Sequence, residues 1–141
     1  MPNRPITITG INPDNSLILS DHGHTSANPG DTITWLIAQK SGVTAINSIL
    51  PKAGSPNIFK PAPGPVGHSS NWRGTIDPSI HAPVEEDYSI GYSKIIGGDF
   101  VFDPKISVNS KKYFFKKKFI FFLFTLLGLS LSRVLLHRNK K

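Results

Sequence analysis

The chain contains no cysteine, so it can form no disulfide, and its cysteine content assigns it to neither an oxidising nor a reducing compartment. Proline and glycine are missing from most of its last third. All twelve prolines lie at or before Pro104, and eleven of the twelve glycines lie at or before Gly98. Acidic residues are missing there too, since residues 111–141 hold nine basic residues and no acidic one. These absences divide the chain into two regions that meet near Ser110.

The net charge of +7 belongs to the second region alone. Residues 1–110 contain seven basic and nine acidic residues, and their lysines are scattered rather than clustered. Phosphate backbones are bound by clustered basic side chains. We therefore expect no nucleic-acid partner, although the overall charge alone would suggest one.

The second region is dominated by a long apolar run. Of the 18 residues from 119 to 136, 13 are Phe, Ile, Leu or Val. As a helix, this run would cover about 27 Å, close to the hydrocarbon thickness of a bilayer. We predict a basic juxtamembrane segment (111–118), a transmembrane helix (119–136) and a basic tail (137–141). The expected anchor residues are Phe119, Ile120, Phe121, Phe122, Leu123, Phe124, Leu126, Leu127, Leu129 and Leu131.

Two other interpretations of this run stay open. A buried helix of a soluble protein should show a polar face, and FIFFLF shows none. The abrupt change in composition also fits read-through into a neighbouring reading frame. The basic and apolar pattern resembles a secretory signal peptide as well, but its C-terminal position argues against that role.

The orientation of such an anchor is weakly determined by charge. Five lysines precede the apolar run, and four basic residues lie from Arg133 onward, which slightly favours a cytoplasmic body. The first residues, MPNRPITITG, contain no apolar stretch that would direct export. We expect a single-pass membrane protein whose body lies in the cytoplasm, with the lipid bilayer as a partner.

Residues 1–110 show short alternating runs separated by turn residues, and no helical periodicity. Thr, Ile, Val and aromatic residues dominate these runs, which is typical of strands. The pattern predicts an all-β domain, an antiparallel Greek-key sandwich, with the Pro-rich residues 51–67 as a long surface loop. The predicted strands are 5–11, 16–20, 32–38, 43–49, 71–76, 87–95, 99–102 and 105–109.

The same alternation predicts which side chains fill the core of this domain. Residues two apart along a strand point to the same face, so the apolar ones share the interior. The expected core is Ile6, Ile8, Leu17, Leu19, Ile33, Trp35, Ile37, Ile46, Ile76, Tyr88, Ile90, Tyr92, Phe100, Phe102, Ile106 and Val108.

Three stretches of the body resemble the cupredoxin-like family: HTSANPGDTITWL, EDYSIGYSK and the closing DPKISVN. In that family a PGD turn begins a central strand that carries an aromatic residue, and a later Tyr-containing strand leads into the last one. The resemblance covers most of residues 5–109, although other sandwiches, including immunoglobulin-like ones, share parts of it. The matching residues are Pro29, Gly30, Asp31, Trp35, Tyr88 and Tyr92.

The copper ligands of that family are missing. Where copper cupredoxins carry a His and then a Cys with a following His, this chain reads SGVTAINSI and GYSKIIGGDF. A blue-copper centre needs its thiolate. The resemblance therefore implies the fold and no function, and we expect no cofactor.

DHGHTS is the one stretch with metal-ligand spacing. In an extended backbone His22 and His24 would point to the same side, and Asp21, His68 or His81 could complete a Zn or Cu(II) site. The alternative is an ordinary turn in which Asp21 and Thr25 make local hydrogen bonds.

Signals for catalysis are weaker. GHSSNW lacks the spacing of a nucleophile elbow, and IIGGDF lacks the helix and lysine of a phosphate loop. The carboxylates of Glu85, Glu86 and Asp87 are interpreted as a solvated strand edge. Trp72 follows the Pro-rich loop and could stack on a carbohydrate or peptide, the alternative being a packing tryptophan.

Together these observations favour a non-enzymatic β-sandwich that is tethered to a membrane and binds a protein or carbohydrate partner. The alternative is a Zn- or Cu-binding protein that uses the two histidines of DHGHTS.

Overall fold

The computed structural model describes residues 1–109, and this part of the chain is built of strands and turns with no helix. Each predicted strand is confirmed, with ends that differ by a few residues. Two further strands, β3 and β6, were not predicted. The ten strands are β1 (Asn3–Ile11), β2 (Leu17–Leu19), β3 (His24–Ala27), β4 (Thr32–Ile37), β5 (Val43–Pro51), β6 (Gly64–Pro65), β7 (Trp72–Thr75), β8 (Val84–Lys94), β9 (Asp99–Phe102) and β10 (Lys105–Val108).

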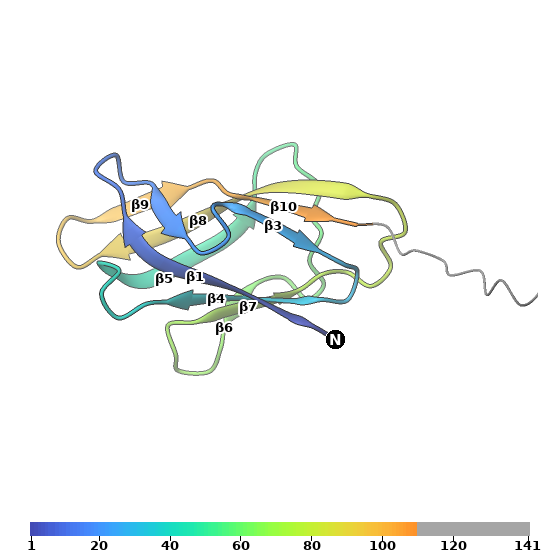
Figure 1. Cartoon of the computed structure of the whole chain (residues 1–141), viewed down its shortest axis with the longest axis horizontal. Helices are drawn as coiled ribbons and strands as arrows, with labels where there is room; N and C mark the ends of the chain where they lie inside the picture. Colours follow the sequence, from blue (N-terminus) through green and yellow to red (C-terminus); the bar gives the residue numbers. More distant parts are fainter. Residues whose placement is uncertain (110–141) are drawn as a thin grey trace, which may run out of the picture. The chain divides into compact units, whose positions relative to one another are not determined.

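The strands form two sheets that face one another (Figure 1). The first has the order β2-β1-β4-β7-β6, and the second has the order β3-β10-β8-β5, with β9 also paired to β8. Both sheets are mixed, because β1 runs parallel to β4 and β3 runs parallel to β10. The prediction of antiparallel sheets was therefore wrong at these two pairs. Alternation assigns a side chain to a face, but it carries no information on the direction of the neighbouring strand.

The core lies between the two sheets and follows the alternation of the strands. Ile33 and Trp35 of β4 are buried, as are Tyr88, Ile90 and Tyr92 of β8. Of the predicted core residues, only Ile37, Phe100 and Phe102 are partly rather than fully buried. The other buried apolar side chains are Ala27, Val43, Ile49, Ile58 and Phe59. Because the buried core closes within residues 6–108, we treat residues 1–110 as a unit that folds by itself.

The Pro-rich stretch is not wholly the surface loop that was predicted. Ile58 and Phe59 are buried, and the Phe59 ring lies 5.8 Å from the ring of Trp35. The backbone is held by hydrogen bonds from Lys60 N to Thr75 O and from Asp77 N to Ile58 O, both 2.8 Å long. Prolines interrupt regular pairing, yet two adjacent apolar residues between them fold inward. We call residues 52–63 the covering segment.

Strand β5 forms one edge of the second sheet. Its pairing with β8 shifts register twice, between Val43 and Ala45 and again between Ile46 and Ser48. It ends at Pro51, which has no backbone N–H to donate. The outer edge of this sheet is therefore irregular.

The last described residue and the turn that follows β8 lie at opposite ends of the sandwich. Val108 pairs with Val84 at the start of β8, so Asn109 lies at the opposite end of that strand from Lys94 (Figure 1). We call the end at Lys94, with turns 12–16, 38–42 and 95–98, the far end. Asn109, the last described residue, therefore lies at the other end of the sandwich from these three turns.

Candidate functional site

An open groove of about 540 Å³ lies at the far end, where three turns meet. This volume lies in the usual range for ligand sites. Apolar side chains supply most of the wall, and β1, β4 and β8 each lead into a turn that contributes to it. The lining residues are Ile11, Asn12, Pro13, Ser41, Gly42, Lys94, Ile95 and Ile96.

Two adjacent isoleucines make this end unusually apolar. Ile95 and Ile96 are 65% and 84% exposed, and they sit where β8 turns into β9. Gly97 and Gly98 follow with φ of 109° and 86°, a conformation that glycine adopts without steric cost. The tight turn holds both aliphatic side chains in water. Large exposed aliphatics grouped with an apolar groove are typical of an interaction site.

Side chains of β8 fix the neighbouring turns in place. The Tyr92 hydroxyl donates to the carbonyl of Asn15, and the Lys94 ammonium donates to Asn15 Oδ1 at 2.8 Å. The amide of Ile95 donates to Gly42 O at 3.0 Å. These bonds tie turns 12–16 and 38–42 to β8. The groove is therefore formed by residues that the fold already holds together.

Lys94 is the charged member of this lining. Its ammonium lies 4.7 Å from the centre of the Phe100 ring, and one of its three N–H donors is used by Asn15. Among residues 1–109 no carboxylate forms an ion pair with it. A positive charge beside an apolar groove favours a ligand group that is aliphatic and close to a negative charge.

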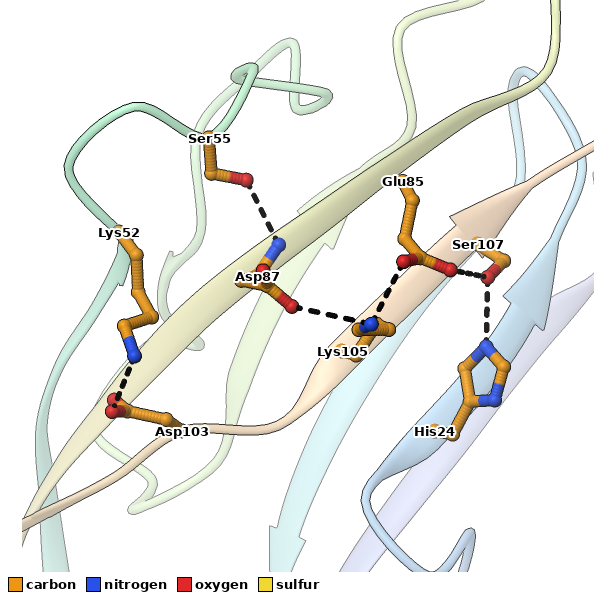
Figure 2. Close-up of polar contacts among 8 residues, drawn as sticks. All are labelled: His24, Lys52, Ser55, Glu85, Asp87, Asp103, Lys105 and Ser107. Carbon is orange, nitrogen blue, oxygen red and sulfur yellow. Dashed lines mark hydrogen bonds and ion pairs between the residues drawn. The ribbon is translucent and has the colours of Figure 1, made fainter.

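The outer face of the second sheet carries a different cluster, of charged and polar side chains (Figure 2). The Lys105 ammonium lies 2.8 Å from Glu85 Oε1 and 3.7 Å from Asp87 Oδ1. Lys52 and Asp103 form a second pair at 2.8 Å. These hydrogen-bonded pairs lower the pKa of the Glu85 and Asp103 carboxyls, and all of them are exposed enough for water to weaken them.

A chain of hydrogen bonds within this cluster superficially resembles a catalytic triad. His24 Nε2 lies 2.7 Å from Ser107 Oγ, which lies 2.9 Å from Glu85 Oε2 (Figure 2). The ionised Glu85 only accepts, so the hydroxyl donates to Glu85 and accepts from a protonated His24 Nε2. In a nucleophilic triad the imidazole instead removes the serine proton. The order of these three residues does not provide that arrangement.

The two histidines predicted to bind metal lie in different local structures. His22 is in a turn with φ of 56°, so the extended backbone that the prediction required is not formed, and His24 begins β3. Asp21 accepts hydrogen bonds from Gly23 N, at 3.0 Å, and from Thr25 Oγ1. No group of three or more His, Cys, Asp or Glu side chains within residues 1–109 is arranged to hold a metal ion.

Trp72 lies on β7, in register with Trp35 of β4. Its side chain is half-buried and packs against the core, as the alternative interpretation of this residue describes. It does not contribute to the groove at the far end.

Two features were missed in the sequence. The groove at the far end depends on turns that are distant along the chain, although the two isoleucines before a glycine pair were a local signal. Glu86 was expected on a solvated edge with Glu85 and Asp87, but it is only 1% exposed and points into the core. The alternation of β8 puts Glu86 on the same face as Tyr88.

The predicted juxtamembrane segment, transmembrane helix and basic tail lie outside the described residues. Within residues 1–109, no helix has the length and apolarity that a membrane crossing requires. No protein-family model matches the chain, and no curated protein matches it.

Proposed function

We propose that the protein is a non-enzymatic binding module that is tethered to a membrane through residues 119–136 and binds a protein partner at the far end. The exposed Ile95 and Ile96 beside the groove are the observation that carries this proposal. A tether that follows Asn109 would be attached at the end of the sandwich opposite the groove. The tether and the proposed binding surface therefore do not compete for the same residues.

The chemistry of the groove supports a protein rather than a carbohydrate as the proposed partner. Carbohydrates are commonly recognised by an exposed aromatic side chain, and the lining described within residues 1–109 contains none. Its aliphatic wall and the Lys94 ammonium instead suit a protein segment with aliphatic side chains next to a carboxylate. We commit to such a segment as the occupant.

The fold of the tethered module is proposed to be cupredoxin-like. Support comes from the turn at Pro29, Gly30 and Asp31, which precedes β4, the middle strand of its sheet. The Tyr-containing strand β8 precedes β9 and β10 and pairs with both of them. The cytoplasmic location of the body is part of the same proposal and rests on the charge distribution of the sequence.

The tether is tested by fractionating cells that express either the full chain or residues 1–110. We expect the full chain to sediment with membranes and to resist extraction by high salt, while the shorter form stays soluble. Equal solubility of the two forms would refute the tether.

The binding surface is tested separately, on residues 1–110, with synthetic aliphatic peptides that carry one Glu, one Gln or one Lys. In methyl NMR spectra we expect the Glu peptide to shift Ile95 and Ile96 most strongly and the Lys peptide least. Ile96→Ser should abolish the shift of the remaining Ile95 methyl groups. Leu50→Ser is the matched control, because Leu50 is 60% exposed on β5, away from the groove lining. Methyl shifts that do not depend on the charge of the peptide would exclude the assigned site. An Ile95 shift that persists in Ile96→Ser would exclude it as well.

A further inference from the structure

The carboxyl group of Glu86 is buried inside the sandwich and is hydrogen-bonded to the covering segment. Its Oε2 accepts a hydrogen bond from the backbone amide of Ile58 at 2.7 Å. Glu86 is 1% exposed and Ile58 is also 1% exposed. A buried carboxylate normally has a cationic partner. Within residues 1–109, no Lys, Arg or His forms an ion pair with Glu86.

The polar groups near this carboxyl offer no positive charge. On its own strand, Tyr88 has a hydroxyl that accepts a hydrogen bond from Trp35 Nε1 of β4 at 3.1 Å. Burial is the main cause that raises the pKa of Tyr88, and the carboxylates of Asp21, in the turn before β3, and of Glu86 raise it further. From β10, Ile106 pairs with Glu86 in register. Among the groups of residues 1–109, a single hydrogen bond from a backbone N–H therefore offsets the cost of burying ionised Glu86.

The same bond is one of several that hold the covering segment, which is also tied to β8 by the bond from Lys52 N to Asp87 O at 2.9 Å. On the β7 side, the segment is attached by the hydrogen bonds of Ile58 O and Lys60 N described above. On the β8 side, Ser55 Oγ accepts from Asp87 N at 2.8 Å near the edge, and Glu86 holds the buried amide of Ile58. Release of Ile58 would let water reach the carboxylate and would lift Phe59 off Trp35.

We propose that Glu86 acts as a pH-dependent latch on the covering segment: the neutral carboxyl keeps Ile58 docked, and ionisation drives the segment to open so that water can solvate the charge. This inference is independent of the membrane tether and of the groove.

The direction of the effect follows from the carboxyl's surroundings. Burial raises the pKa of Glu86 from its ordinary 4.5 to about 7, and the hydrogen bond from Ile58 opposes this only in part. In the open segment the hydrated carboxyl regains an ordinary pKa. The closed form therefore holds more protons between these two values, and rising pH favours the open form. The equilibrium of the latch therefore changes between about pH 4.5 and about pH 7.

The latch is tested by amide hydrogen exchange at Ile58 and Phe59, on the full chain in detergent micelles, at about pH 5.5 and about pH 8.5. After correction for intrinsic exchange, we expect protection at Ile58 to fall by about tenfold or more at the higher pH. This fall is smaller than the full change in the opening equilibrium that the two pKa values of Glu86 allow. The Ile8 amide, in β1, is the internal reference. Glu86→Gln keeps an acceptor oxygen and removes the charge, so protection should become independent of pH.

A second measurement covers the case in which Glu86→Gln does not fold. In the unaltered protein, the carboxyl carbon resonance of Glu86 should titrate with the same midpoint as the exposure of the Phe59–Lys60 bond to chymotrypsin. A midpoint below about pH 5 would overturn the proposal, because the carboxyl would then be ionised in the closed form. Equal loss of Ile58 protection in the wild type and in Glu86→Gln would overturn it as well.

Discussion

Replacing Gly74 with alanine tests how tightly the covering segment is packed. Gly74 lies on the inner face of β7, and its φ is not in the left-handed region, so alanine meets no backbone obstacle there. The obstacle is steric, because neighbouring side chains occupy the space that an added Cβ would need. An added Cβ would lie 2.8 Å from Phe59 Cδ1, 3.0 Å from Phe59 Cε1 and 3.0 Å from Pro63 Cγ. These contacts are shorter than van der Waals separation, so the Phe59 ring must move.

The ring has little freedom to do so, because Phe59 is 6% exposed and packs against Trp35. Overpacking of this kind costs about 1 to 3 kcal/mol. Alanine regains about 0.5 to 1 kcal/mol by restricting the unfolded chain. We expect a net loss of about 1 to 2 kcal/mol in the free energy of unfolding, which corresponds to about 5 to 15 °C in Tm for a domain of this size.

The assay is urea and thermal unfolding of residues 1–110. Gly64→Ala is the matched control, because its added Cβ meets no atom within 4 Å and its φ is also not left-handed. Phe59→Leu in the Gly74→Ala background should recover part of the loss, so the double-mutant cycle should show coupling of about 1 kcal/mol. A Gly74→Ala variant as stable as Gly64→Ala, or a cycle without coupling, would show that the segment is not packed as described.

Three further predictions concern unfolding of residues 1–110. Glu86 binds its proton more tightly when folded, so stability should fall by about 2 kcal/mol as pH rises from about 4.5 to about 7, and Glu86→Gln should flatten that slope in urea titrations. Asp31→Ala should cost about 2 kcal/mol, because the buried carboxylate accepts from Asn28 N and from an arginine, each at 3.0 Å; Asp31→Asn should cost less. Zn²⁺ or Cu²⁺ should leave Tm unchanged, since His22 and His24 lie in different local structures; a gain that vanishes in the double alanine variant would restore the metal hypothesis.

Much of the fold could be predicted because alternation is a local property. The strands around Ile33, Trp35 and Tyr88 carry apolar residues at a period of two, and this pattern alone places them in a β core. The sequence does not predict strand β3, because HTSA is short and directly follows a turn with Gly23. Strand β6 has two residues and contains a proline, which leaves no pattern to detect.

The rest depends on contacts between distant segments. The burial of Ile58 required knowledge that the covering segment returns to β7 and β8. Glu86 sits on the buried face of its strand, but its neighbours Glu85 and Asp87 are exposed, and charge alone favoured solvent for all three. The groove forms only where Pro13, Gly42 and Ile95 converge from three turns. Sequence periodicity carries no information on such convergence.

The irregular outer edge of β5 has a consequence for the membrane tether proposed above. Copies held on a membrane by that tether would diffuse in two dimensions at high local density, where regular strand edges would pair with one another. Two shifts of register and a terminal proline interrupt the ladder that a neighbouring copy would need. Such copies would be kept from pairing along this side.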